Sequence, residues 1–253
     1  MLPSQAQLKS MVSAYIDDAR ATTTKNLSEA KSSLMFKQIY HCSLSTEVVL
    51  KELSTPVLKP PINRPRSIVL RVPLLVAVGQ PAVARTELRR YLELIFWMIY
   101  FSDHPVEWRK FVDSSGSGFS RDTRKPILYA AHRELQSYLE YATELMEGDR
   151  SGIAIAALSN LKGLIHTLNA AIHPGELARR QGKFTPFDAV DEKSLKSFLS
   201  LQQGVFSNTC LLLAAFKKAR FEQFTAGTRS HFDWLIGQKR AKDLRLGQFG
   251  LNL

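Results

Sequence analysis

The side chains best suited to chemistry in this sequence are Lys162, His166, Asn169 and His173, which are separated by four, three and four residues. At about 100° per residue, this spacing places all of them on one stripe of a helix. An imidazole exchanges protons near neutral pH, and an amide orients a phosphate or fixes an imidazole tautomer. The stripe has two interpretations: a working surface for such chemistry, or a solvated face opposite the core.

The helix that carries the stripe is predicted over residues 151–173, and Pro174-Gly175 ends it. Its apolar residues recur in steps of four and three, the spacing of a buried helix face. They are Ala154, Leu158, Leu161, Ile165, Leu168 and Ile172. The polar stripe lies beside this seam, and the turn leaves the end of the helix accessible.

Further helices are predicted on both sides of this one. The apolar rhythm indicates long helices over 81–101, 126–148 and 192–221. The first fifty residues predict shorter helices over 5–21, from 26 or 28 to about 40, and over 46–53. We therefore expect an all-α protein with an antiparallel helical bundle over 81–221 and a helical N-terminal segment over 1–54.

The segment between them is rich in proline. Residues 55–67, TPVLKPPINRPRS, hold four prolines, a density that neither a helix interior nor a central strand tolerates. The apolar, β-branched run 68–78 then predicts one or two extended segments. We expect 55–80 to be a linker with a short extended segment, and 222–253 to be a basic C-terminal segment that contains aromatic residues.

Composition limits the classes of function. The 253 residues include 34 Lys and Arg against 23 Asp and Glu, a net charge of +11, which favours contact with nucleic acid. The two cysteines are far apart and show no CxxC spacing, so we expect buried thiols. No apolar run reaches the roughly 18 residues that cross a bilayer, and the first residues do not resemble a secretory signal. We expect a cytoplasmic protein with no membrane contact and no cofactor.

The order of the long helices and the segment NLKGLIHTLNAAIHPG resemble the HEPN superfamily, helical bundles of bacterial toxin–antitoxin and antiviral systems. The hallmark of that family is an Arg, a polar residue (often Asn), three further residues and a His at the end of a core helix. Asn169 and His173 match it, and ARTELRRYLELIFWMIY is similar to HEPN helices that open with an Arg. The resemblance covers about residues 81–216. It implies a defence role, RNA rather than DNA as the partner, and a homodimer or a subunit of a complex.

One position departs from the family pattern, because Leu168 stands where the Arg is expected, on the apolar seam. The resemblance implies that, in active members, the His and the Arg of two protomers together cleave RNA without a metal ion. The imidazole handles a proton and the guanidinium stabilises the phosphorane charge. Leucine does neither, so Arg124, Arg179 or Arg180 would have to approach in three dimensions.

Two functions therefore stay open. The first is RNA binding or metal-independent RNA cleavage, with His173, Asn169 and His166 as the catalytic group. The second is a non-catalytic basic helical subunit that binds nucleic acid or assembles a multi-subunit defence complex. The residues expected to contact nucleic acid are Lys162, Arg179, Arg180, Lys239, Arg240, Lys242 and Arg245.

Weaker features of the sequence have plainer explanations. His104, in SDHPVEW, resembles a site, but capping of a helix end explains it as well. His166, His173 and Glu176 are too few and too far apart to predict a metal site. The sequence has no GxxxxGK[ST], no GxGxxG between strand and helix, and no GxSxG.

The C-terminal segment interleaves basic residues with aromatic ones. Basic groups beside aromatic rings suit single-stranded nucleic acid, where phosphates pair and bases stack. An amphipathic helix whose aromatic side chains dock on the bundle accounts for the pattern equally well. The aromatic residues concerned are Phe221, Phe224, Phe232 and Trp234.

Overall fold

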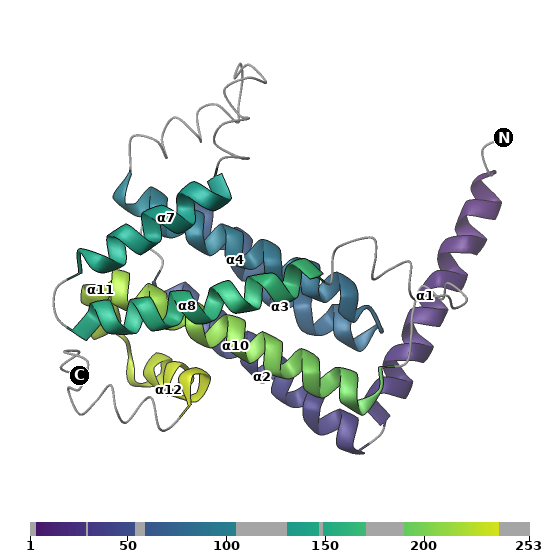
Figure 1. Cartoon of the computed structure of the whole chain (residues 1–253). Helices are drawn as coiled ribbons and strands as arrows, with labels where there is room; N and C mark the ends of the chain where they lie inside the picture. The colour runs from purple at the N-terminus through teal and green to yellow at the C-terminus, as the bar shows by residue number, and fades with distance from the viewer. Residues whose placement is uncertain are drawn as a thin grey trace.

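The computed structural model describes residues 4–28, 30–53, 59–104, 131–146, 149–170 and 190–237. These residues form an all-α bundle without strands, which confirms the predicted fold class (Figure 1). The helices are α1 (Gln5–Ser28), α2 (Ala30–Glu52), α3 (Lys59–Ala77), α4 (Pro81–Asp103), α7 (Ala131–Glu144), α8 (Asp149–Ala170), α10 (Glu192–Phe216), α11 (Lys218–Glu222) and α12 (Ala226–Ile236).

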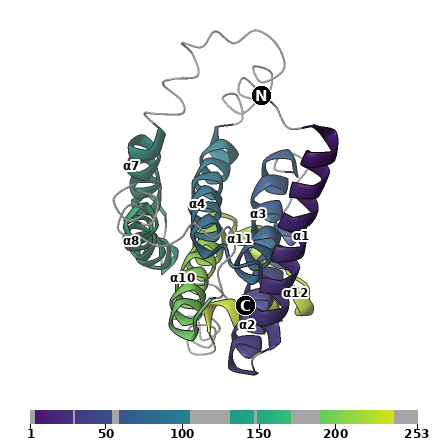
Figure 2. The ribbon, with the colours of Figure 1, turned by 90° about the vertical axis from the view of Figure 1, so that its right-hand side faces the viewer.

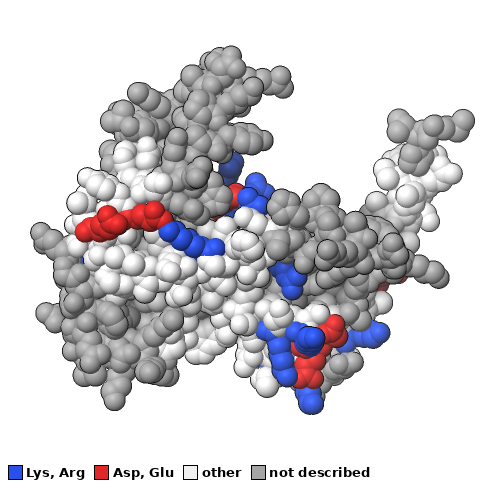
Figure 3. Space-filling model, viewed as in Figure 1, with Lys and Arg blue, Asp and Glu red and all other residues white. Residues whose placement is uncertain are grey.

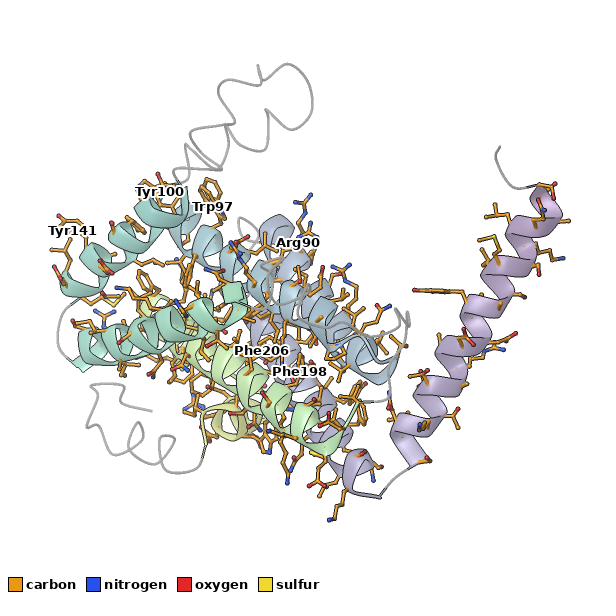
Figure 4. All side chains as sticks on the ribbon, turned by 45° about the vertical axis from the view of Figure 1, so that its right-hand side comes forward. Arg90, Trp97, Tyr100, Tyr141, Phe198 and Phe206 are labelled. Atoms are coloured by element: carbon orange, nitrogen blue, oxygen red, sulfur yellow. The ribbon has the colours of Figure 1, made fainter. Side chains whose placement is uncertain are left out.

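Helix α10 is the centre of the bundle, in contact with α2, α4, α8 and α12. Phe198 and Phe206 project from it into the core, where Tyr91 of α4 meets Phe206 edge to face at 4.9 Å (Figure 4). The Tyr91 hydroxyl lies 2.9 Å from Thr209 Oγ1, so its polar end is satisfied inside the core. Asp191 caps the start of α10 by accepting a hydrogen bond from the Ser194 amide.

The amino-acid composition of α10 has two further consequences. It is the one described helix long and apolar enough to cross a membrane, but 83% of its apolar window is buried inside the bundle. Cys210 lies on this helix and Cys42 on α2, and both are buried free thiols, as predicted. Burial raises the pKa of Cys210 to about 12 and that of Cys42 further still.

Residues 59–77 form α3, so the prediction of a linker and an extended segment here was wrong. Pro65 and Pro73 lie inside the helix, where each removes a backbone hydrogen bond and costs about 3 kcal/mol. Packing against α2 and α4 offsets this cost, because each fully buried aliphatic side chain contributes about 1.5–3 kcal/mol. The buried side chains are Ile62, Ile68, Val69, Val72 and Val76.

The N-terminal helices and the later ones share one hydrophobic core. Helix α2 spans both helices predicted between residues 26 and 53, and it packs against α3, α10 and α12. Gln202 of α10 donates Nε2 to the Ile39 carbonyl at 3.2 Å and to Ser43 Oγ at 2.8 Å, both on α2. The segment 55–80, which we expected to be a linker between two regions, therefore belongs to a single core shared by the helices on both sides of it.

Helix α1 lies at the edge of the bundle, beside α2 and α3 (Figure 2). It extends to Ser28, beyond the predicted end at residue 21. Asn26 anchors its C-terminal end, because its side chain is buried and bonds two other elements. Nδ2 donates to the Ala77 carbonyl at 2.9 Å, and Oδ1 accepts from the Val190 amide at 3.1 Å.

Candidate nucleic-acid interface at the end of α8

Helix α8 lies with its apolar seam in the core, packed against α4, α7 and α10. Leu158, Leu161, Ile165 and Leu168 are all buried, which confirms the predicted seam. A Cβ at Gly204 of α10 would lie 3.2 Å from Leu164 Cδ1, so this glycine lets the two helices approach closely. Since α8 is held along its length, the side chains of its last turn have a fixed direction.

The polar stripe runs along α8 beside that seam. Lys162 Nζ forms an ion pair with Glu140 of α7, and both side chains are largely exposed. The carboxylate partly neutralises the one positive charge in the described part of the stripe, while an exposed pair of this kind adds only about 0–1 kcal/mol of stability. His166 is exposed on the same helix. Figure 3 shows that most of the described surface over α7 and α8 is uncharged.

Two neighbouring residues in the last turn of α8 differ in how deeply they are buried. Leu168, which stands where the HEPN motif has an Arg, is fully buried, as its place on the apolar seam predicted. Asn169 is half-buried, and its Oδ1 is buried with no hydrogen-bond partner among the described residues. A buried oxygen without a hydrogen-bond donor lowers the stability of the fold by about 1–3 kcal/mol, so a ligand that donates a hydrogen bond to it would bind favourably.

Helix α4 contributes a second polar group at this end of the bundle. It packs against α8 and runs in the opposite direction, so the end of α8 lies toward the N-terminal half of α4 (Figure 1). Arg85, on that half, is half-buried, and its Nε is buried without a hydrogen-bond partner in the described part of the chain. The sequence analysis named the segment ARTELRR, which begins with Ala84 and Arg85, but it did not predict Arg85 as a site residue. The reason is that only the packing of α4 on α8 relates Arg85 to Asn169.

Arginines are concentrated on the hairpin formed by α3 and α4. Glu87 forms ion pairs with Arg71, at 3.0 Å, and with Arg90, at 3.8 Å, and Arg90 projects outward in Figure 4. Two further pairs are Arg66 with Glu47 and Arg89 with Glu93. Together with Arg64 and Arg85, the described residues on and beside this hairpin include six arginines against these three glutamates. The hairpin therefore has a local excess of guanidinium groups, which bind phosphate in bidentate geometry.

The aromatic side chains of the C-terminal region dock on the bundle. Phe221, Phe224 and Phe232 are buried and contact one another, with ring centroids 4.6–6.4 Å apart. Trp234 is half-buried, 4.1 Å from the ring of His41. The docking interpretation is therefore correct for the three phenylalanines, whose faces are not available to stack on bases.

His104 acts at the C-terminal end of α4. Its backbone amide and its Nδ1 both lie within hydrogen-bond distance of the Tyr100 carbonyl, at 3.1 and 2.9 Å. Its ring stacks on Tyr100 at 4.0 Å and meets Tyr138 of α7 edge to face. This confirms the capping interpretation, and it makes His104 part of the junction between α4 and α7.

Several predicted site residues lie outside the described residues. They are His173, Arg179, Arg180, Lys239, Arg240, Lys242 and Arg245, together with Arg124 and Glu176. The roles expected for them stay predictions. Of the other site residues, the structure places Asn169, His166 and Lys162 on one helix, with Arg85 toward the same end.

Comparison with known proteins adds no relative: no family model, no curated protein and no solved structure matches this chain.

Proposed function

We propose that this chain is a HEPN-like component of a bacterial defence or toxin–antitoxin system that binds RNA without cleaving it by the usual route. The observation that carries this proposal is the full burial of Leu168 beside the half-buried Asn169. The motif position that would supply a guanidinium belongs to the core, while the amide oxygen of the neighbouring Asn169 has no donor among the described residues. A site of this kind keeps its ability to bind and lacks the charge that stabilises a phosphorane.

RNA is the proposed ligand because of charge. The chain has a net charge of +11, and the α3–α4 hairpin has more arginines than glutamates. Phosphate neutralisation supplies most of the affinity of such a surface. Arg85 offers a donor to phosphate, and Asn169 Oδ1 accepts from a base amino group or a ribose hydroxyl, the group that distinguishes RNA from DNA.

Binding of short single-stranded RNA and DNA tests this proposal, measured by fluorescence anisotropy over a salt series. Asn169→Ala should weaken RNA binding about five- to tenfold, the worth of one hydrogen bond of about 1–1.4 kcal/mol. Arg85→Ala should reduce the slope of log affinity against log salt by about 0.7, one phosphate contact on a single strand. Ser159→Ala, an exposed change on α8, is the matched control and should leave both unchanged. Equal affinity of Asn169→Ala and the unaltered chain for RNA would contradict the proposal.

A second candidate function is metal-independent RNA cleavage, and Arg85 favours it, because its buried Nε has no hydrogen-bond partner among the described residues. In that mechanism His173 transfers the proton and Arg85, rather than a motif arginine, stabilises the charge on the phosphorus oxygens. Incubation with total RNA separates the two functions. Cleavage that persists in EDTA and disappears in both His173→Ala and Arg85→Ala supports catalysis, whereas intact RNA with retained binding supports the first proposal.

A further inference from the structure

The first turns of α1 stand clear of the bundle (Figures 1 and 4). Every residue from Ser4 to Asp18 is exposed, and burial begins only at Ala19 and becomes complete at Asn26. We call residues 5–18 the α1 arm. At 1.5 Å per residue, the arm is a rod of about 20 Å that its own bundle does not cover.

The arm carries a continuous apolar stripe. Its members are spaced by three, one, three and one residues, so they lie on one face of the helix. Between 45% and 64% of each side chain is exposed, which makes them the main group of exposed large apolar residues in the described part of the chain. They are Leu8, Met11, Val12, Tyr15 and Ile16.

An uncovered arm of this length is unfavourable by itself. Isolated helices of about 12–15 residues are marginally stable in water, because packing of the apolar face supplies most helical stability. Each of the five side chains exposes on the order of 100 Å² of mainly apolar surface. Two such arms packed together would bury about 1,000 Å², the lower limit for a specific interface.

The chemistry of the arm selects its partner. Asp17 and Asp18 end the arm, and Lys9 is the one basic residue between Gln5 and Asp18. Helices that lie on membranes are rich in Lys and Arg and bind anionic lipid, so this arm is a poor membrane anchor. A second copy of the chain offers an identical apolar stripe, and self-complementary surfaces of this kind form two-fold dimers.

The burial pattern also sets the direction of the two arms. The face that is apolar in the arm continues through Ala19 to Asn26, where the helix packs on its own bundle. A parallel partner would run into that bundle, whereas an antiparallel partner places its bundle beyond the far end of the arm. In the antiparallel arrangement Val12 lies opposite Tyr15, and Leu8 lies opposite Ala19, so small and large apolar side chains alternate.

We propose that the α1 arm pairs with the α1 arm of a second copy in an antiparallel two-helix seam that makes the protein a dimer. This interface does not depend on the proposed RNA site, because it uses none of the residues of that site. The failure of one proposal therefore leaves the other standing.

Sedimentation of the full chain over a concentration series tests the seam. The unaltered chain should reach a mass of about twice 28.5 kDa. Val12→Asp should shift the dimer dissociation constant upward at least tenfold, because it places a charge inside the apolar seam. Ser10→Asp adds the same charge on the polar face of the arm and is the matched control. Both changes lie outside the core, so thermal unfolding of the bundle should be unchanged in each.

Disulfide trapping tests the direction of the arms. A mixture of Leu8→Cys and Ala19→Cys chains should form the mixed disulfide in preference to either symmetric one, while the buried Cys42 and Cys210 stay reduced. Preferential Leu8→Cys self-trapping would overturn the antiparallel arrangement. A chain that is monomeric throughout the series, or a Val12→Asp dimer as stable as the unaltered one, would overturn the interface itself.

Discussion

Replacing Leu168 by Arg introduces the arginine that the HEPN motif has at this place, and the result distinguishes a core position from a site position. The resemblance alone suggests a gain of RNA cleavage. The structure predicts instead that the bundle is destabilised, because Leu168 is fully buried in the core that α8 shares with α4 and α10. The change removes an apolar side chain from this core and adds a guanidinium without an acid partner.

The magnitude follows from two contributions. Loss of a buried Leu side chain costs about 2–5 kcal/mol in Leu→Ala changes. An unpaired buried charge adds about 3–5 kcal/mol, less whatever the long arginine stem recovers by reaching solvent from the last turn of α8. We expect a total of about 5 kcal/mol, comparable to the whole stability of many domains. At about 2–4 °C per kcal/mol, this corresponds to a Tm lower by about 10–20 °C.

Circular dichroism during thermal and urea unfolding measures this effect, with Leu168→Met as the control that conserves volume. Leu168→Met should cost less than about 1.5 kcal/mol. A Leu168→Arg protein that loses less than about 1 kcal/mol would show that the side chain at this position reaches solvent. Metal-independent cleavage gained by that stable variant would then place residue 168 in a working site and refute the reasoning.

Three further predictions concern the α8 seam, the C-terminal segment and the cap of α10. Leu161→Ala should lower the unfolding free energy by about 2–5 kcal/mol in a urea titration, because Leu161 is fully buried on the α8 seam. Deletion of 239–253 should flatten the salt dependence of RNA affinity by about 0.7–0.9 per lost phosphate contact, and an unchanged slope would assign this segment another role. The hydrogen bonds from Ser194 lower the pKa of Asp191, so its capping contribution should be complete above about pH 4 and lost as the pH falls through the lowered pKa. The Tm difference between the unaltered chain and Asp191→Ala should therefore shrink on acidification, and a difference that grows would contradict this assignment.

The sequence by itself determined which residues of the long helices face the core. The steps of three and four along α8 placed Leu158, Leu161, Ile165 and Leu168 on one seam, and all are buried. This succeeds because helical periodicity is a local property: burying one face requires apolar residues at fixed intervals, whatever the partner helix is. The same reasoning placed Leu168 in the core and Asn169 beside it before any packing was known.

Only the tertiary structure decided that residues 59–77 form the helix α3. Pro65 and Pro73 argue locally against a helix, and the β-branched run argues for a strand. The free energy that overrides both comes from packing against α2 and α4, two helices that propensity over a short window does not take into account.

The tertiary structure also decided the surroundings of the candidate site and the exposure of the α1 arm. Arg85 and Asn169 are far apart in sequence, and only the crossing of α4 and α8 directs them toward one end of the bundle. The apolar pattern of α1 is the pattern of any core-facing helix, yet residues 4–18 have no core to face. Periodicity specifies that a face must be buried, whereas the identity of the surface that buries it depends on the arrangement of the whole chain and of its partners.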